Sequence, residues 1–123
     1  MAREQKIPGP DHPITVQAEG THVVARVGDT VIAETRDALT LREANYPPAY
    51  YVPLADVDPA VLRPSDTTTY CPYKGEASYY SVETPSGGVT DAMWFYPQPY
   101  DAVGGIVDHV AFYTDRLDVV ADA

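Results

Sequence analysis

The residues best suited to chemistry in this 123-residue chain gather in one stretch, from Ser65 to Ser81. It holds the only cysteine, Cys71, and one of the two lysines, Lys74, three positions further on. A thiol beside an ammonium group can become a nucleophilic thiolate. A lysine among aromatic rings can act as a Schiff-base nucleophile, a clamp for a ligand carboxylate, or a cation stacked on a ring. Cys71 and Lys74 are therefore the two candidate catalytic residues.

Both candidates also have a structural interpretation. Cysteine is among the most buried residue types, and no Cys–His pairing motif surrounds Cys71, so we prefer a buried structural thiol over a nucleophile. For Lys74 the structural alternative is an ion pair with Glu76, or with another carboxylate, that pins the loop. We give this alternative the same weight as a contact with a ligand.

Aromatic residues surround these candidates. The chain has ten tyrosines, two phenylalanines and one tryptophan, and all of them lie between Tyr46 and Tyr113. Rings supply contact area and phenols supply directed hydrogen bonds, so the pattern favours a pocket for a small organic or cationic ligand; the alternative is a Tyr-rich core. The candidate ligand-binding residues are Tyr70, Tyr73, Glu76, Tyr79, Tyr80 and Trp94.

The charge balance narrows the possible partners. Eight basic against eighteen acidic residues give a net charge of −10. A surface that follows nucleic acid needs clustered lysine and arginine, so we expect no nucleic-acid partner. A single cysteine permits no intrachain disulfide and no cysteine-rich zinc site, and no histidine spacing suggests another metal site. We therefore expect no bound metal and no cofactor.

Three further features bear on the compartment. The lone cysteine fits a reducing cytoplasm, and the first residues have no apolar core of the kind a signal peptide requires. No apolar run approaches the roughly 18 residues of a membrane span. We expect a cytoplasmic protein with no membrane partner, acting as a monomer or a homodimer on a small organic ligand.

Apolar periodicity predicts a mainly β protein, and twelve prolines leave no room for a long helix. Residues 22–27, 30–35 and 38–43 alternate and predict a first antiparallel meander. A second meander is predicted from four further segments, namely 65–70, 77–83, 89–96 and 109–113. Residues 49–52, which follow Pro47 and Pro48, predict a short strand at a sheet edge or between bulges.

The remaining segments complete a single compact domain of about eight short strands, spanning residues 14–123. Residues 1–13 carry three prolines and predict an extended N-terminal arm, with His12 solvated at its end. Asp58 and Pro59 are typical of the start of a helical turn. A loop is expected at 71–76, irregular chain at 97–105, and a short helix or a frayed tail at 116–122.

These motifs resemble a known family. Its pattern is matched by Thr69-Tyr-Cys-Pro-Tyr-Lys-Gly-Glu-Ala-Ser-Tyr-Tyr80, by Tyr50-Tyr-Val-Pro53 and by Ala92-Met-Trp-Phe-Tyr96. Over residues 12–116 the chain resembles the bacterial and fungal family called domain of unknown function 427, also labelled nucleotidyltransferase-like. The resemblance implies a β-tent-like fold, similar to methionine sulfoxide reductase B and to the drug-binding domain of cereblon. Those relatives hold zinc with paired Cys-x-x-Cys motifs, which Cys71 alone cannot replace.

The sequence lacks the motif that the nucleotidyltransferase label requires. Such an enzyme needs a Gly-Ser cradle for phosphates and two carboxylates, two residues apart, that hold Mg²⁺. Asp56 and Asp58 have this spacing, but no Gly-Ser precedes them. We interpret the pair as part of a surface turn.

Two functions follow from the pattern. The first is a small-molecule-binding domain or small enzyme, with a Tyr- and Trp-lined pocket between the 71–76 loop and the strand of Trp94. The second is a non-enzymatic module that docks a peptide or a protein on its aromatic face. An enclosed pocket with Lys74 or Cys71 in its wall favours the first, and a flat exposed tyrosine patch favours the second.

Overall fold

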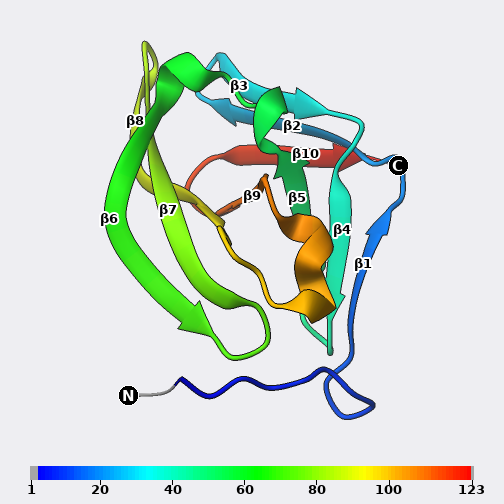
Figure 1. Cartoon of the computed structure of the whole chain (residues 1–123). Coiled ribbons are helices and arrows are strands. Elements are labelled where there is room, and N and C mark those ends of the chain that lie inside the picture. Colours follow the sequence, from blue (N-terminus) through cyan, green and yellow to red (C-terminus); the bar gives the residue numbers. More distant parts are fainter. Residues whose placement is uncertain (1–2, 123) are drawn as a thin grey trace.

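The computed structural model describes residues 3–122. Within that range the chain forms ten strands and three short 3-10 helices, which Figure 1 shows in chain order. The elements are β1 Ile14–Ala18, β2 His22–Val27, β3 Thr30–Thr35, β4 Leu39–Glu43, β5 Ala49–Pro53, η1 Leu54–Asp56, η2 Pro59–Val61, β6 Leu62–Cys71, β7 Gly75–Thr84, β8 Gly87–Phe95, η3 Asp101–Ile106, β9 His109–Phe112 and β10 Asp118–Asp122.

The strands form two antiparallel sheets. One has seven strands in the order β1-β4-β5-β9-β8-β7-β6, and the other has three in the order β10-β2-β3. In Figure 1 the smaller sheet crosses the upper end of the long strands. The prediction of a mainly β single domain is confirmed, and no helix within residues 3–122 reaches seven residues.

The two predicted meanders have different outcomes. The second is confirmed, because β6, β7, β8 and β9 are successive neighbours in the large sheet. In the first, β2 and β3 form the expected hairpin around Gly28, whose φ is +56°. The third predicted strand, 38–43, is present as β4, but it pairs with β1 and β5 instead of β3. The predicted three-stranded meander over 22–43 is therefore wrong. Alternation of apolar residues identifies a strand but does not indicate which strand it pairs with.

Strand β5 is central and its pairings have no register shift, so neither predicted setting, a sheet edge or a position between bulges, is found. It lies between β4 and β9, with Leu41 opposite Ala49 and Val52 opposite Val110. Pro47 and Pro48 precede the strand, and Pro53 is its last residue. Pro53 is opposite His109, so the missing N–H groups lie before the strand or at its last residue, and a central position is tolerated.

The ends of the chain also differ from expectation. Residues 118–122 form a strand that pairs with β2, so the prediction of a short helix or frayed tail over 116–122 is wrong. Without this strand, the edge of β2 that faces away from β3 would have unpaired backbone groups. The β-branched Val119 and Val120 also favour an extended chain. Strand β1 was not predicted; it pairs with β4 and has only two apolar residues facing inward, Ile14 and Val16.

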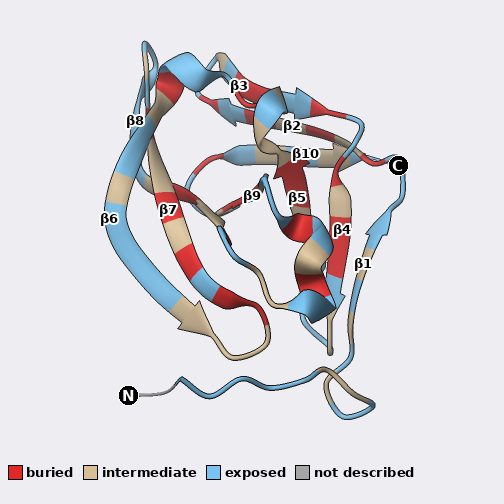
Figure 2. Cartoon of the chain, in the orientation of Figure 1, coloured by how far each residue is buried: buried red, intermediate tan, exposed pale blue. Residues whose placement is uncertain are grey.

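Two apolar clusters lie on opposite sides of the large sheet. The first joins it to the small sheet through residues such as Val23, Ile32 and Met93. The second includes Tyr51 and Ile106, the latter from η3. Because neighbouring residues along the central strands point to opposite faces, both faces are buried there, and buried segments alternate along β7 in Figure 2.

The predicted two-sided burial of strand 89–96 is seen in β8. Trp94 and Tyr96 pack in the second cluster, while Met93 and Phe95 pack in the first. Ala92 lies in the first cluster, although alternation placed it with Trp94. Asp91 has a φ of +49°, and the register of β7 and β8 shifts near it, so the alternation breaks at this point.

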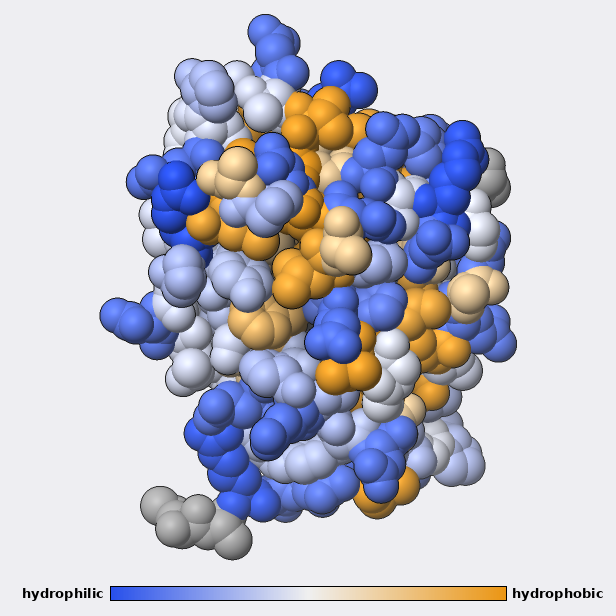
Figure 3. All heavy atoms as spheres, turned by 45° about the horizontal axis from the view of Figure 1, so that its top comes forward, coloured by the Kyte–Doolittle hydropathy of each residue, from blue (hydrophilic) through white to orange (hydrophobic). Residues whose placement is uncertain are grey.

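Apolar side chains reach the surface in separate patches among hydrophilic ones, on the face drawn in Figure 3. Among the described residues the exposed large hydrophobic side chains are Ile7, Val31, Tyr46, Val107 and Val120. Only Tyr46 among them is aromatic. The described helices include none with the length and apolar character to cross a membrane.

Candidate functional site

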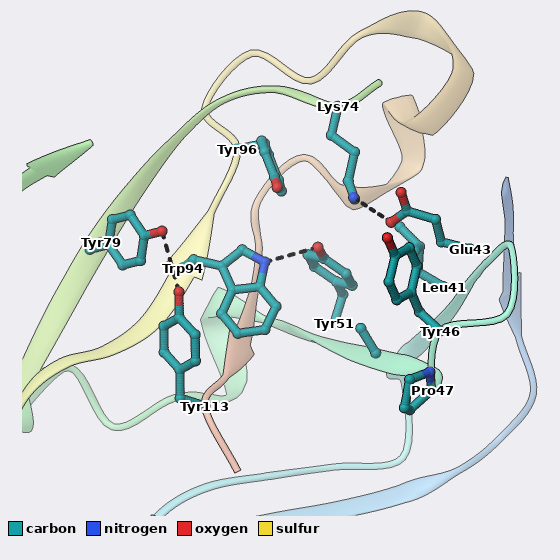
Figure 4. Close-up of a pocket in the computed structure, with 11 residues that line it drawn as sticks. Leu41, Glu43, Tyr46, Pro47, Tyr51, Lys74, Tyr79, Trp94, Tyr96 and Tyr113 are labelled. Carbon is teal, nitrogen blue, oxygen red and sulfur yellow. Dashed lines mark hydrogen bonds and ion pairs between the residues drawn. The ribbon is translucent and has the colours of Figure 1, made fainter. Parts of the chain in front are cut away.

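A cavity of about 230 Å³ opens within the second cluster, between the ends of β4 and β5, strand β8 and the β6–β7 turn (Figure 4). It is lined by Leu41, Glu43, Tyr46, Pro47, Ala49, Tyr51, Lys74, Tyr79, Trp94, Tyr96 and Tyr113. The lining combines an aromatic wall with one buried ion pair.

Strand pairing builds the aromatic wall. Trp94 lies opposite Tyr79 on one neighbouring strand and opposite Ala111 on the other. Its indole Nε1 donates a hydrogen bond of 3.0 Å to the hydroxyl of Tyr51, and the two rings meet edge to face at 89°. This bond gives the indole N–H a partner and fixes both rings.

A second pair of phenols closes the wall beside the indole. The Tyr113 ring centroid lies 4.6 Å from that of Trp94, and the Tyr113 hydroxyl donates to the Tyr79 hydroxyl at 3.3 Å. Thr69 holds the Tyr79 hydroxyl from the other side at 2.9 Å. Burial and the bond to Tyr79 raise the pKa of Tyr113 to about 12, so it stays an uncharged phenol at neutral pH.

The polar end of the cavity is a three-residue cluster around Glu43. Lys74 Nζ donates to Glu43 Oε1 at 2.6 Å, and His12 Nε2 lies 2.7 Å from Glu43 Oε2. The Lys74 and Glu43 side chains are only 11% and 16% exposed. Burial alone would raise the pKa of Glu43, but the hydrogen bonds and charges of Lys74 and His12 outweigh it and lower that pKa.

The β6–β7 turn holds Lys74 in place through its backbone. Lys74 N donates to the carbonyl of Cys71, and the Lys74 carbonyl accepts from Tyr100 N at 2.9 Å. Gly75 follows with a φ of +116°, a conformation that side chains rarely adopt. The Lys74 ammonium also reaches Cys71 Sγ at 3.5 Å.

Comparison with known proteins identifies the family. A family model described as domain of unknown function (DUF427) matches residues 15–123. The chain belongs to the DUF427 family. No curated protein matches it. The resemblance inferred from the sequence motifs is confirmed, and the family description names no activity.

Three of the predicted site residues of this DUF427 domain line the cavity, namely Lys74, Tyr79 and Trp94. Tyr73, next to Lys74, points elsewhere and stacks on His12 with ring centroids 4.1 Å apart. Cys71 is half-buried, with its Sγ 3.5 Å from Lys74 Nζ, and is not part of the cavity lining.

The other predicted residues lie away from this cavity. Tyr70 and Glu76 line a separate hollow of about 300 Å³, where Glu76 pairs with Arg3 at 2.8 Å. Tyr80 lies on the opposite face of the sheet and stacks on Phe95 with a centroid distance of 4.7 Å.

Sequence reasoning missed several lining residues. Glu43 is the carboxylate that pairs with Lys74, and 31 positions separate them. Tyr51, Tyr96 and Tyr113 come from three further parts of the chain. Their clustering between residues 46 and 113 was the available signal, but it does not say which rings share a face.

The N-terminal arm, which precedes the residues matched to the family, contacts the same turn. Lys6 N donates to the carbonyl of Pro72 at 2.9 Å, and the Tyr70 hydroxyl donates to the carbonyl of Glu4 at 2.6 Å. His12, predicted to be solvated, instead contacts Glu43 with its side chain 26% exposed. Through these contacts, residues 4–12 are a packed part of the site's surroundings.

Neither a metal cluster nor a carboxylate pair for Mg²⁺ emerges from the described residues. Within residues 3–122, no group of three or more histidine, cysteine, aspartate or glutamate side chains could hold a metal ion. Asp56 accepts a hydrogen bond from Thr35 at 2.7 Å, and Asp58 caps η2 by accepting from Ala60 N at 3.0 Å. Both carboxylates serve local structure, in line with a surface turn.

Proposed function

We propose that this DUF427 domain binds a small organic molecule in the cavity lined by Trp94 and five tyrosines. The observation that carries the proposal is the cavity itself, about 230 Å³ in volume, with a buried Lys74–Glu43 pair at one end. An apolar cavity of roughly 150 Å³ can hold benzene, so this cavity suits a molecule built on one ring. Mostly apolar walls with a few polar groups are typical of ligand sites.

The burial of the rings supports a pocket over a docking face. Tyr51, Tyr79 and Tyr96 are 1%, 8% and 7% exposed. Tyr46, at 65%, is the one exposed aromatic side chain among the large hydrophobic residues of the described chain, and it stands at the cavity's rim. A module that docks proteins through its tyrosines would present these rings on an open surface.

Binding is better supported than covalent catalysis. The Lys74 ammonium donates to Glu43, and an ammonium group is not a nucleophile. Cys71 contacts the Lys74 ammonium and is not among the lining residues. Neither candidate therefore presents a free nucleophile to a bound molecule.

The test uses four probes with the same ring and different head groups: ethylbenzene, acetophenone, benzoate and benzylammonium. Trp94 is the only tryptophan, so its indole N–H gives one ¹H–¹⁵N signal that reports directly on the cavity. We expect at least one probe to shift this signal in a saturable way.

A cavity-filling variant shows whether binding occurs in this cavity. Ala49→Phe places a ring inside it and should weaken binding by about tenfold or more, the effect of losing a roughly 1.4 kcal/mol contact. Ala102→Phe is the matched control, because Ala102 is exposed on η3 and does not line the cavity. Failure of all four probes, or binding that survives Ala49→Phe unchanged, contradicts the proposed function.

A further inference from the structure

Three residues that line the cavity each have an O–H or N–H group without an acceptor among the described residues. The Tyr51 hydroxyl accepts from Trp94, and its own proton has no acceptor among residues 3–122. The Tyr96 hydroxyl makes no hydrogen bond to any described residue, although Tyr96 is only 7% exposed. Lys74 has three N–H donors, of which Glu43 and Cys71 take two.

The three donors face the same space. All three residues line the cavity. In Figure 4 the hydroxyls of Tyr51 and Tyr96 and the ammonium of Lys74 point into the region beside the Trp94 indole. Burial raises the pKa of both phenols well above the ordinary value, so each keeps its proton at neutral pH. The cavity thus offers donors at one end and rings at the other.

Charge decides which kind of acceptor suits these donors. Glu43 balances the positive charge of Lys74 at 2.6 Å, and His12, its other partner, does not line the cavity. Against the cavity wall an anion would therefore bring a second negative charge into a buried site. A cation would face the Lys74 ammonium and would leave all three donors unpaired. An uncharged acceptor avoids both penalties.

We propose that the polar end of the ligand is an uncharged carbonyl oxygen, held by Tyr51, Tyr96 and Lys74 while the ligand's ring lies against Trp94. The inference rests on the proposed function and names the chemical class of its ligand. Among the described residues, Thr40 Oγ1 is the one buried side-chain polar atom without a partner, so the Tyr96 hydroxyl is accessible from the cavity. A carbonyl oxygen that accepts from two phenols and an ammonium group satisfies all three donors at once.

The four probes separate this inference from the proposed function. Acetophenone carries an uncharged carbonyl, whereas benzoate, benzylammonium and ethylbenzene carry an anion, a cation and no polar group. We expect acetophenone to bind about three- to tenfold more tightly than ethylbenzene, as one or more added neutral hydrogen bonds would give. Benzoate and benzylammonium should bind more weakly than acetophenone. The Trp94 indole signal should also respond most to the ketone, because the indole N–H donates to the Tyr51 hydroxyl, which would in turn donate to the ketone oxygen.

A single-atom change tests the donor set. Tyr96→Phe removes a hydroxyl that bonds to no described residue, so the variant should fold with an unchanged or higher Tm. It should weaken acetophenone binding about three- to tenfold and leave ethylbenzene binding unchanged. Tyr80→Phe removes a hydroxyl on the opposite face of the sheet and should change neither affinity.

Each outcome has a distinct meaning. Binding of ethylbenzene, benzoate or benzylammonium as tightly as acetophenone overturns the carbonyl inference and leaves the proposed function intact. So does a Tyr96→Phe variant that keeps the full preference for the ketone. If none of the four probes binds, the proposed function fails and this inference fails with it.

Discussion

At the scale of single residues, Glu43 organises the polar end of the cavity. It binds Lys74 through one carboxylate oxygen and His12 through the other, and each partner lies 31 positions away in the sequence. Lys74 stood out because lysine is scarce in this chain. Glu43 is one of eighteen acidic residues with no local signature, so only the pairing of β4 within the sheet reveals it. Sequence reasoning recognised the ammonium but not its carboxylate.

Replacing Glu43 by glutamine should destabilise the fold at neutral pH. The variant loses charge-assisted bonds to Lys74 and His12 and leaves a buried ammonium without its counter-ion, which should cost about 1.5–3 kcal/mol. Urea unfolding at pH 7 measures the loss. Glu34→Gln is the control, because Glu34 also lies 2.7 Å from a histidine, His22, but its side chain is 60% exposed.

The same comparison has a defined pH dependence. The pKa of Glu43 is lowered in the folded protein, so its contribution is complete above the unfolded value of about 4.3 and is lost as the pH falls through the folded value. The stability gap between wild type and Glu43→Gln should therefore be widest near neutral pH and shrink below about pH 4.3. A gap that widens on acidification would contradict the role given to the carboxylate.

At the scale of elements, strands could be predicted from the sequence but their partners could not. The hairpins around Gly28 and between β7 and β8 were recognised because strand, turn and returning strand are contiguous. The pairings β1–β4 and β10–β2 join segments far apart in the chain, and apolar alternation is the same whichever edge a strand joins. The cavity also depends on the pairing of β4 with β5, which places Leu41 opposite Ala49, and both of these residues line it.

The β6–β7 turn offers a test at this scale. Gly75→Ala should destabilise the fold by about 1–3 kcal/mol, because φ is +116° there and the added Cβ would lie 3.2 Å from the carbonyl oxygen of Gln98. Thermal unfolding measures the change, and the Trp94 indole signal shows whether the aromatic wall of the cavity has changed. Gly104→Ala, in η3, meets nothing within 4 Å and should be close to neutral. Equal Tm values for the two variants would show that the turn adapts freely.

At the scale of the whole molecule, the two apolar clusters on the large sheet have different roles. Every tyrosine, phenylalanine and tryptophan lies after residue 45, and the second cluster includes most of those that line the cavity. The first cluster holds the small sheet against the large one with mostly aliphatic side chains. The cavity therefore lies on one face of the large sheet while the small sheet covers the other face. A change in the small sheet reaches the cavity only through the stability of the whole domain.

Shortening the chain at its C-terminal end tests that division. Removing residues 117–123 deletes Leu117, which is 8% exposed in the first cluster, and uncovers the edge of β2 by removing β10. Loss of one buried leucine side chain costs about 2–5 kcal/mol, and the lost strand adds to this, so we expect a large fall in Tm or failure to fold. Removing only residues 122–123 takes away the exposed Asp122 and should leave Tm nearly unchanged.

If the longer deletion leaves both Tm and acetophenone affinity intact, the small sheet is dispensable and the large sheet stabilises the cavity alone. If Tm falls while the remaining folded protein binds with unchanged affinity, the two clusters act independently, as their separation by the large sheet predicts.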